Sequence, residues 1–203
     1  MKKLWKDNSL KSITNTPAFV YDFSQQSFND AICFLEQAKK QDFFKKPFTY
    51  WKYCVWSIVA SSAFFESYTI AHIRRITHSV DQSIFDVYSE PEKMMGFLQN
   101  IEFIDTTFDS KINDPLDKDW QSIEYIRNIR HKIMHHKKLD LMDDFTVDNA
   151  QIGINVSRSL VKKLHSIEGT NYKKFAYWID ATKCTDYDKV NWQKLLENPE
   201  TYH

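Results

Sequence analysis

The chain has 203 residues, 42% of them hydrophobic and 15% aromatic, with only three glycines and five prolines. This composition is too apolar for a disordered chain and too poor in glycine and proline for a turn-rich β-sandwich. Its 27 basic and 27 acidic residues balance, which excludes a uniformly basic nucleic-acid-binding surface, so any such binding must come from a local patch.

The N-terminal part is predicted to hold an extended lead-in over residues 1–23 and then two helices. The first helix begins at an N-cap serine, Ser24 or Ser27, and runs to about Gln41. The second runs from about residue 48 to 78, and its many apolar and small residues predict that it is largely buried. The apolar residues at helical spacing in the first helix are Phe28, Ile32, Leu35 and Ala38.

Helix signals continue after a gap in the pattern. Pro91 suits the first turn of a helix that contains Met94, Met95, Phe97, Leu98, Ile101 and Ile104. Residues 105–115 are predicted to form a loop. Asp117 or Asp119 can cap the following helix, which extends to about Lys137.

The C-terminal part begins with an acidic segment, residues 139–147, predicted as a loop or short strand. Asp148 starts another helix, which Gly169 closes in a C-cap role. A last helix is predicted over residues 172–182. The predicted organisation is the lead-in, one all-α, single-domain bundle of five or six helices over residues 24–182, and a polar tail over residues 183–203.

Cys33, Cys54 and Cys184 are odd in number, far apart and without a CxxC pair. They suggest neither a disulfide framework nor a zinc site, so we expect free thiols in a reducing, cytoplasmic compartment. The longest apolar run, residues 53–65, is shorter than the ~20 residues that a bilayer span needs. We therefore expect a soluble protein with no membrane partner.

The segment 127–138 carries most of the functional information. It contains two arginines, three histidines and three lysines, and no acidic residue. Arginine stays charged and histidine titrates near neutral pH, so together they can hold a phosphodiester and move its protons. On an ideal helix a polar stripe opposes an apolar face. The stripe consists of Glu124, Arg127, Asn128, His131 and His135, and the apolar face of Ile126, Ile129 and Ile133.

The spacing from Arg130 to His135, Arg-His-Lys-Ile-Met-His, resembles the Arg-x(4–6)-His signature of the HEPN superfamily. These are all-helical proteins that include many metal-independent ribonucleases. A polar residue often follows the arginine in that family, and His131 stands there. His136 also satisfies the spacing from Arg130.

A second likeness lies in the long helix, in the segment Ala-Phe-Phe-Glu-Ser-Tyr that ends at Tyr68. Several HEPN groups carry a Phe-Glu pair in an early helix, with the acid near the basic motif, and Glu66 corresponds to that acid. The resemblance covers the motif helix and, more loosely, residues 50–170. It implies cleavage of RNA without a metal or other cofactor, leaving 2′,3′-cyclic phosphate ends. It also implies homodimers with facing motifs.

Residues 130 and 135 lie roughly 140° apart on an ideal helix, so they do not share a face. The long reach of arginine, a loosened helix near His135, or a site shared across a dimer would reconcile the motif with this geometry. Arg127 is better placed for contact with His131 and His135. The resemblance ranks Arg130 and His135 first, geometry adds Arg127 and His131, and Glu66 could orient the guanidinium or tune a histidine.

The predicted function is a metal-independent endoribonuclease, acting as a bacterial toxin or defence effector with RNA as substrate and an antitoxin as a possible regulator. The predicted catalytic residues are Arg130, His135, His131, Arg127 and Glu66, and the predicted RNA-binding residues are Lys132, His136, Lys137, Lys138 and Asn128. The acidic stretch 140–144 could shield the basic helix.

Other interpretations remain open. The chain could be a non-catalytic HEPN module that binds nucleotide or RNA or serves as a dimeric scaffold, or a helical protein whose basic helix binds an acidic partner. A metal site at His131 and His135, completed by Glu66 or His72, is less favoured. The aromatic residues of the long helix are expected in the core rather than stacked on bases. They are Trp51, Tyr53, Trp56, Phe64, Phe65 and Tyr68.

Overall fold

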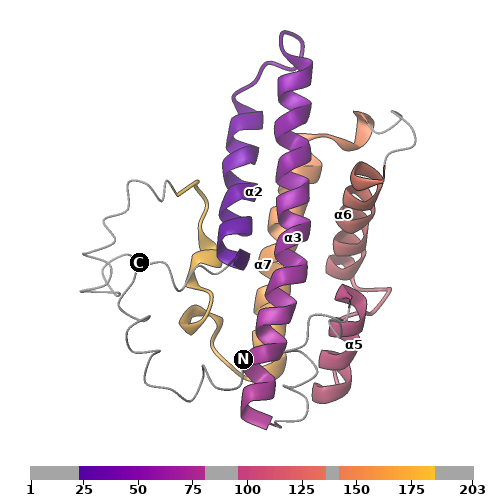
Figure 1. Ribbon diagram of the computed structural model, residues 1–203, viewed down its shortest axis with the longest axis vertical. Helices are drawn as coiled ribbons and strands as arrows, with labels where there is room; N and C mark the ends of the chain where they lie inside the picture. The colour runs from indigo at the N-terminus through magenta and orange to yellow at the C-terminus, as the bar shows by residue number, and fades with distance from the viewer. Residues whose placement is uncertain (1–22, 81–95, 136–141, 186–203) are drawn as a thin grey trace, which may run out of the picture. The chain divides into compact units, whose positions relative to one another are not determined.

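A computed structural model describes residues 23–80, 96–135 and 142–185, with side chains from 74 to 80 and at position 142 excepted. Within these ranges the chain is all-α, with five α-helices, three short 3-10 helices and no strand (Figure 1). The α-helices are α2 (Phe23–Lys39), α3 (Pro47–Val80), α5 (Phe97–Phe108), α6 (Lys118–Met134) and α7 (Val147–Glu168). The 3-10 helices are η3 (Met142–Asp144), η4 (Tyr172–Lys174) and η5 (Tyr177–Asp180). The predicted all-α, single-domain bundle is confirmed.

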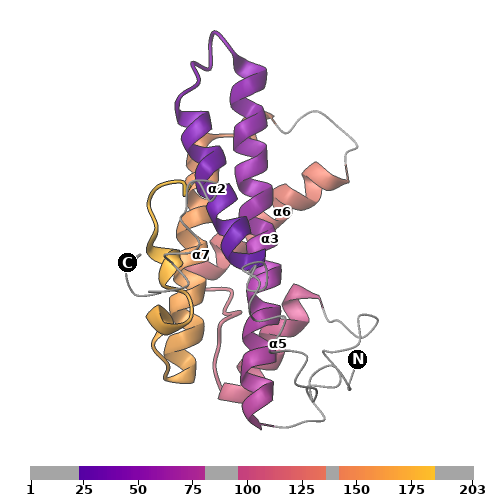
Figure 2. The same cartoon turned by 60° about the vertical axis from the view of Figure 1, so that its left-hand side comes forward.

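The long helix α3 is the centre of the bundle. It contacts α2, α5, α6 and α7, and α2 lies along its N-terminal half as the other arm of a helical hairpin (Figures 1 and 2). The apolar residues predicted for the first helix are all buried, at 4% exposure or less. The core also takes its large side chains from the other helices. They include Ile58, Phe64, Phe65, Ile101, Ile104, Ile126, Ile129, Ile154 and Leu160.

Small residues bring α3 and α7 close together. A Cβ atom added to Gly153 of α7 would stand 2.8 Å from the Ser61 hydroxyl oxygen and 3.0 Å from its Cβ atom. The hydroxyl of Ser61 donates to the main-chain oxygen of Ser57, and the hydroxyl of Ser57 donates to that of Ala31. The serines are therefore satisfied by backbone acceptors while they keep the helices in tight contact.

Most predicted helix ends are close to the observed ones. Asp117 caps α6 as predicted, and Gly169 ends α7 with a left-handed φ of 71°. The N-cap of α7 is Thr146 instead of Asp148, because its hydroxyl accepts the amide hydrogen of Asn149. The sequence thus predicts the start of α7 from its capping chemistry, with an error of two residues.

Other boundaries were wrong. Ser24 and Ser27 do not cap α2, since both lie inside this helix and are buried. The loop predicted over 105–115 starts later, because α5 continues to Phe108 and its Asp105 side chain accepts from the turn that follows. The helix predicted over 172–182 is two 3-10 helices. The lead-in, the predicted helix start at 91–95 and the tail beyond residue 185 lie outside the described residues.

The prediction of free thiols is wrong for two of the three cysteines. Cys33 of α2 forms a disulfide with Cys184, which follows η5, whereas Cys54 is free and buried. Burial raises the pKa of the Cys54 thiol to about 11. The two bonded cysteines are 151 residues apart, so their pairing depends on tertiary structure and leaves no local spacing signal. In the described parts of the chain, no helix has the length and apolar character needed to cross a membrane.

Candidate functional site

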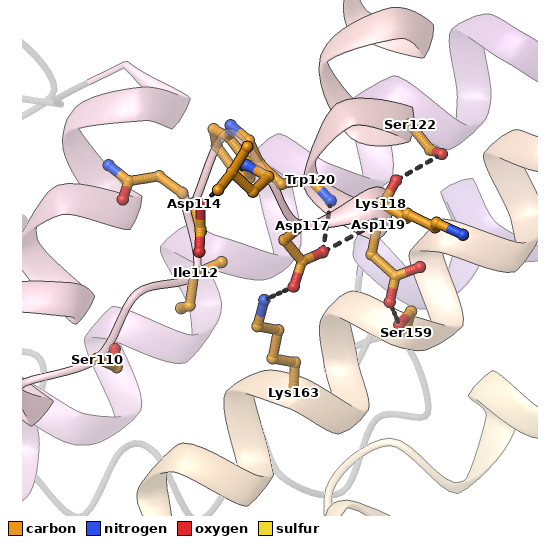
Figure 3. A network of polar contacts seen from close by, with 12 residues as sticks. Ser110, Ile112, Asp114, Asp117, Lys118, Asp119, Trp120, Ser122, Ser159 and Lys163 are labelled. Atoms are coloured by element: carbon orange, nitrogen blue, oxygen red, sulfur yellow. Dashed lines mark hydrogen bonds and ion pairs between the residues drawn. The ribbon is translucent and has the colours of Figure 1, made fainter.

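The N-terminal end of α6 is tied to α7 by a polar network (Figure 3). The Asp117 carboxylate accepts the amide hydrogens of Asp119 and Trp120, at 2.8 and 3.0 Å, and Lys163 of α7 donates to its other oxygen at 2.6 Å. The Lys163 hydrogen bond, followed by that from the Trp120 amide, lowers the pKa of Asp117. The Ser159 hydroxyl of α7 donates to Asp119. This network fixes where α6 begins.

The apolar face of α6 sets its rotation. Ile126 and Ile129 are fully buried and Ile133 is partly buried, as the isoleucine pattern predicted. Trp120 is also buried, and its ring stacks on that of Phe97 in α5 at 6.1 Å between centroids. With this face in the core, the polar stripe of the helix turns outward.

Arg130 and Glu66 meet across the α3–α6 contact. The distance from Arg130 Nη1 to Glu66 Oε1 is 3.0 Å, and the two side chains are 34% and 36% exposed. Glu66, the acid of the Phe-Glu pair, therefore forms an ion pair with Arg130 of the basic motif. The bond occupies one of the five N–H donors of the guanidinium, which leaves others for a further acceptor.

Arg127 packs against α5, whereas the helix geometry predicted that it would contact the histidines of α6. Its guanidinium carbon is 4.5 Å from the centroid of the Phe97 ring, a cation–π geometry. Burial lowers the pKa of Arg127, the charge of Glu66 opposes this, and the charge of Arg130 adds to it. No hydrogen bond between described residues joins Arg127 to His131 or His135, and the half-buried guanidinium packs on the Phe97 ring of α5 instead.

The two histidines form a pair at the C-terminal end of α6. The ring centroids of His131 and His135 are 4.4 Å apart, and both residues are exposed. The helix ends at Met134, and His135 leaves helical geometry at φ −112° and ψ 28° while its amide still donates to the His131 oxygen. The helix is thus loosened at His135. Among the described residues no hydrogen bond or ion pair joins Arg130 or Arg127 to either ring.

Asp144 of η3, in the segment that follows α6, contacts side chains of α6. This carboxylate accepts from Lys132 at 3.3 Å and from the Tyr125 hydroxyl at 3.4 Å, and its main-chain oxygen accepts from Asn149 at 2.8 Å. Part of the acidic stretch therefore lies on the basic helix, and one predicted RNA-binding lysine is paired. Of the other predicted RNA-binding residues, Asn128 is exposed. His136, Lys137 and Lys138 lie outside the described residues.

Phe97 had not been predicted for the site, since it was expected only as an apolar helix residue. Asp144 belongs to the acidic stretch that was expected to shield the basic helix, although its particular partner was not predicted. Both act through tertiary contacts, with Arg127 and Lys132 respectively. Within the described ranges, no three His, Cys, Asp or Glu side chains gather in a way that could hold a metal ion.

The site thus consists of an arginine–glutamate pair between α3 and α6 and an exposed histidine pair at the end of α6. Comparisons with protein-family models, with curated proteins and with solved structures find no match to this chain. The HEPN resemblance therefore rests on the residues quoted for it, Arg130 to His135 and Glu66.

Proposed function

We propose that the protein is a metal-independent endoribonuclease of HEPN type. The observation that carries the proposal is the combination, on one helix, of an exposed pair of histidine rings and an arginine held by an acid from a neighbouring helix. Histidines supply proton transfer near neutral pH, and a guanidinium supplies paired donors for phosphate oxygens.

RNA provides its own nucleophile. One ring of the His131–His135 pair would accept the 2′-hydroxyl proton as the oxygen attacks phosphorus, and the other would donate a proton to the departing 5′-oxygen. The P–O2′ bond forms and the P–O5′ bond breaks, giving a 2′,3′-cyclic phosphate and a 5′-hydroxyl. With centroids 4.4 Å apart, both rings can reach oxygen atoms of a single phosphodiester.

In this mechanism Arg130 stabilises the negative charge that develops on the phosphate oxygens. Glu66 fixes the guanidinium through Nη1 and leaves its remaining donors for the substrate. Arg127, half-buried on Phe97, adds positive charge behind the site. Glu66 is therefore a positioning residue, and Arg130 is the residue in contact with substrate.

Positions 130 and 135 lie on different faces of an ideal helix, which favours a site completed by a second copy of the chain. In a homodimer with facing motifs, the arginine of one protomer would serve the histidines of its partner. A free ribonuclease of this kind needs restraint in a cell. The proposal therefore includes a role as a toxin or defence effector with a regulatory protein partner.

The Arg130–Glu66 ion pair also favours a second candidate, a non-catalytic HEPN module that binds RNA or nucleotide. An arginine satisfied within its own chain can be a helix–helix contact instead of a catalytic group. The histidine pair separates the candidates, because a binding-only module has no need for proton transfer by its histidines.

Cleavage of total cellular RNA in EDTA tests the proposal. The wild type is compared with His131→Ala, His135→Ala and Arg130→Ala, and with Lys174→Ala, which removes an exposed cation outside α6. We expect each of the first three to lower the cleavage rate by about 10²-fold or more, and the control to match wild type. Cleavage that survives in both histidine variants contradicts the proposal. Intact RNA that still binds, with binding lost in Arg130→Ala, would establish the second candidate.

A further inference from the structure

The turn that joins α2 to α3, taken together with the last residue of α2 and the first residues of α3, has an unusual composition. Residues 39–52 contain five lysines and five aromatic residues but a single acid, Asp42. We call this segment the aromatic tip. In both views its turn lies beyond the ends of α5, α6 and α7 (Figures 1 and 2). It is therefore accessible to a large partner.

The phenylalanines of the aromatic tip face solvent. Phe44 is 91% exposed, Phe48 75% and Phe43 40%. The ring of Phe43 also contacts those of Phe44, Tyr50 and Trp51, with centroids 5.3 to 5.7 Å apart. The exposed rings thus form one continuous apolar cluster, a feature that usually marks an interaction surface.

Local bonds hold this cluster in place. The Asp42 carboxylate accepts the amide hydrogen of Phe44 at 3.0 Å, and its main-chain oxygen accepts that of Lys46 at 2.8 Å. At the base of the tip, the Tyr50 hydroxyl accepts the amide hydrogen of Val147 in α7 at 3.1 Å. Phe43 and Phe44 are therefore held in an ordered turn, and Phe48 lies in the first turn of α3, which is anchored to the bundle.

We propose that the aromatic tip docks onto the surface of an anionic lipid bilayer. Its phenylalanines would enter the boundary between headgroups and acyl chains, where aromatic residues are favoured. Its lysines are all exposed and precede, interrupt and follow the aromatic residues, so they can reach anionic headgroups around the inserted rings. The lysines are Lys39, Lys40, Lys45, Lys46 and Lys52.

This mode of binding needs no membrane-spanning segment. The expectation of no membrane partner came from the length of the apolar runs, which tests spanning helices and not interfacial docking. The proposal is also independent of the ribonuclease proposal, since no residue of the aromatic tip belongs to the Arg/His site.

Two other occupants are possible on chemical grounds. A second copy docked tip to tip would bring its lysines against those of the first, which is repulsive. RNA bases would have to stack on the ring faces, and the Phe43 ring already contacts three neighbouring rings, at 69° to 75° between ring planes. An exposed apolar cluster with cations around it fits the surface of an anionic bilayer, and RNA binding is a distinct outcome of the test below.

The test is co-sedimentation of the full chain with vesicles of phosphatidylcholine, with or without phosphatidylserine. We expect binding to the phosphatidylserine vesicles that weakens as salt rises. Phe44→Ser with Phe48→Ser, and separately Lys45→Glu with Lys46→Glu, should each weaken it by at least about tenfold. Leu116→Ser, at a leucine that is 85% exposed, is the matched apolar control, and Lys111→Glu with Lys174→Glu is the charge control. Both should bind like wild type.

Several outcomes would overturn the proposal. In the first, wild-type protein stays in the supernatant with both kinds of vesicle. In the second, the phenylalanine variants bind as tightly as wild type, which would show that the protein adsorbs by charge alone. Tip substitutions that change only the oligomeric state in light scattering, or only RNA affinity, would assign the tip to those partners instead. Circular dichroism of each variant confirms that the bundle has folded.

Discussion

The two ends of α6 differ in how their side chains are bonded and exposed. At the N-terminal end, Asp117 and Asp119 bond to α7, and Trp120 is buried against α5. At the C-terminal end the helix stops at Met134, and His131 and His135 stand exposed with their rings against each other. Residues that satisfy one another hold the helix, whereas the residues suited to proton transfer are left open to solvent. Under the proposed function, stability and chemistry would therefore be separated along one helix.

The middle of α6 joins the two ends, so a defect there should affect both. Ile126 is fully buried, and its Cγ2 atom is 3.7 Å from the position of a Cβ on Gly153. Ile126→Ala removes three buried carbon atoms and leaves a cavity, which should lower the free energy of unfolding by about 2–5 kcal/mol. Chemical denaturation measures this. Ile133→Ala, at a partly buried site on the same face, is the control, and an equal loss there would show that α6 is not anchored through its centre.

A change at the N-terminal end should have a smaller effect that depends on pH. Asp117→Ala removes the cap and should cost about 0.5–2 kcal/mol of unfolding free energy. Asp117→Asn keeps an acceptor for the cap but removes the charge that faces Lys163, so it isolates the contribution of the ion pair.

The sign of the pH effect follows from the lowered pKa of Asp117. The stability from its charge is present above the unfolded-state pKa of about 3.9, and it is lost as the pH falls through the lower pKa of the folded state. Wild type should therefore exceed Asp117→Asn in stability at neutral pH, and this advantage should shrink in acid. An advantage that grows in acid would contradict the role assigned to Lys163.

The N-cap and the apolar face of α6 were largely predictable from sequence. Asp117 is a local capping signal, and the isoleucines at 126, 129 and 133 repeat with the period of a helix face. Gly169 likewise signals the end of α7 through its conformational freedom at a left-handed φ. These features depend on residues a few positions apart, which is the range that sequence patterns describe.

The tertiary partners of the two α6 arginines were not predictable in the same way. Glu66 was linked to Arg130 only through a family resemblance, and Phe97 under Arg127 was not predicted at all. The Cys33–Cys184 disulfide depends equally on a tertiary contact. The aromatic tip shows a further limit, because composition counts aromatic residues without saying which of them a turn exposes.

The smallest expected effect on stability belongs to the C-terminal end of α6, and it is the sharpest test of the comparison. His131→Ala with His135→Ala removes two exposed rings that contact each other and no buried group. His135 is the C-cap of α6, but its capping bond is made by the backbone amide, which alanine keeps. Surface substitutions that leave such bonds intact usually change the free energy of unfolding by no more than about 0.5 kcal/mol, so the variant should stay within that range of wild type. Any RNA cleavage by the wild type should disappear in the same protein sample. A loss of stability as large as that of Asp117→Ala would mean that the histidines hold the helix end, and the exposed pair would then be a structural cap and not a functional site.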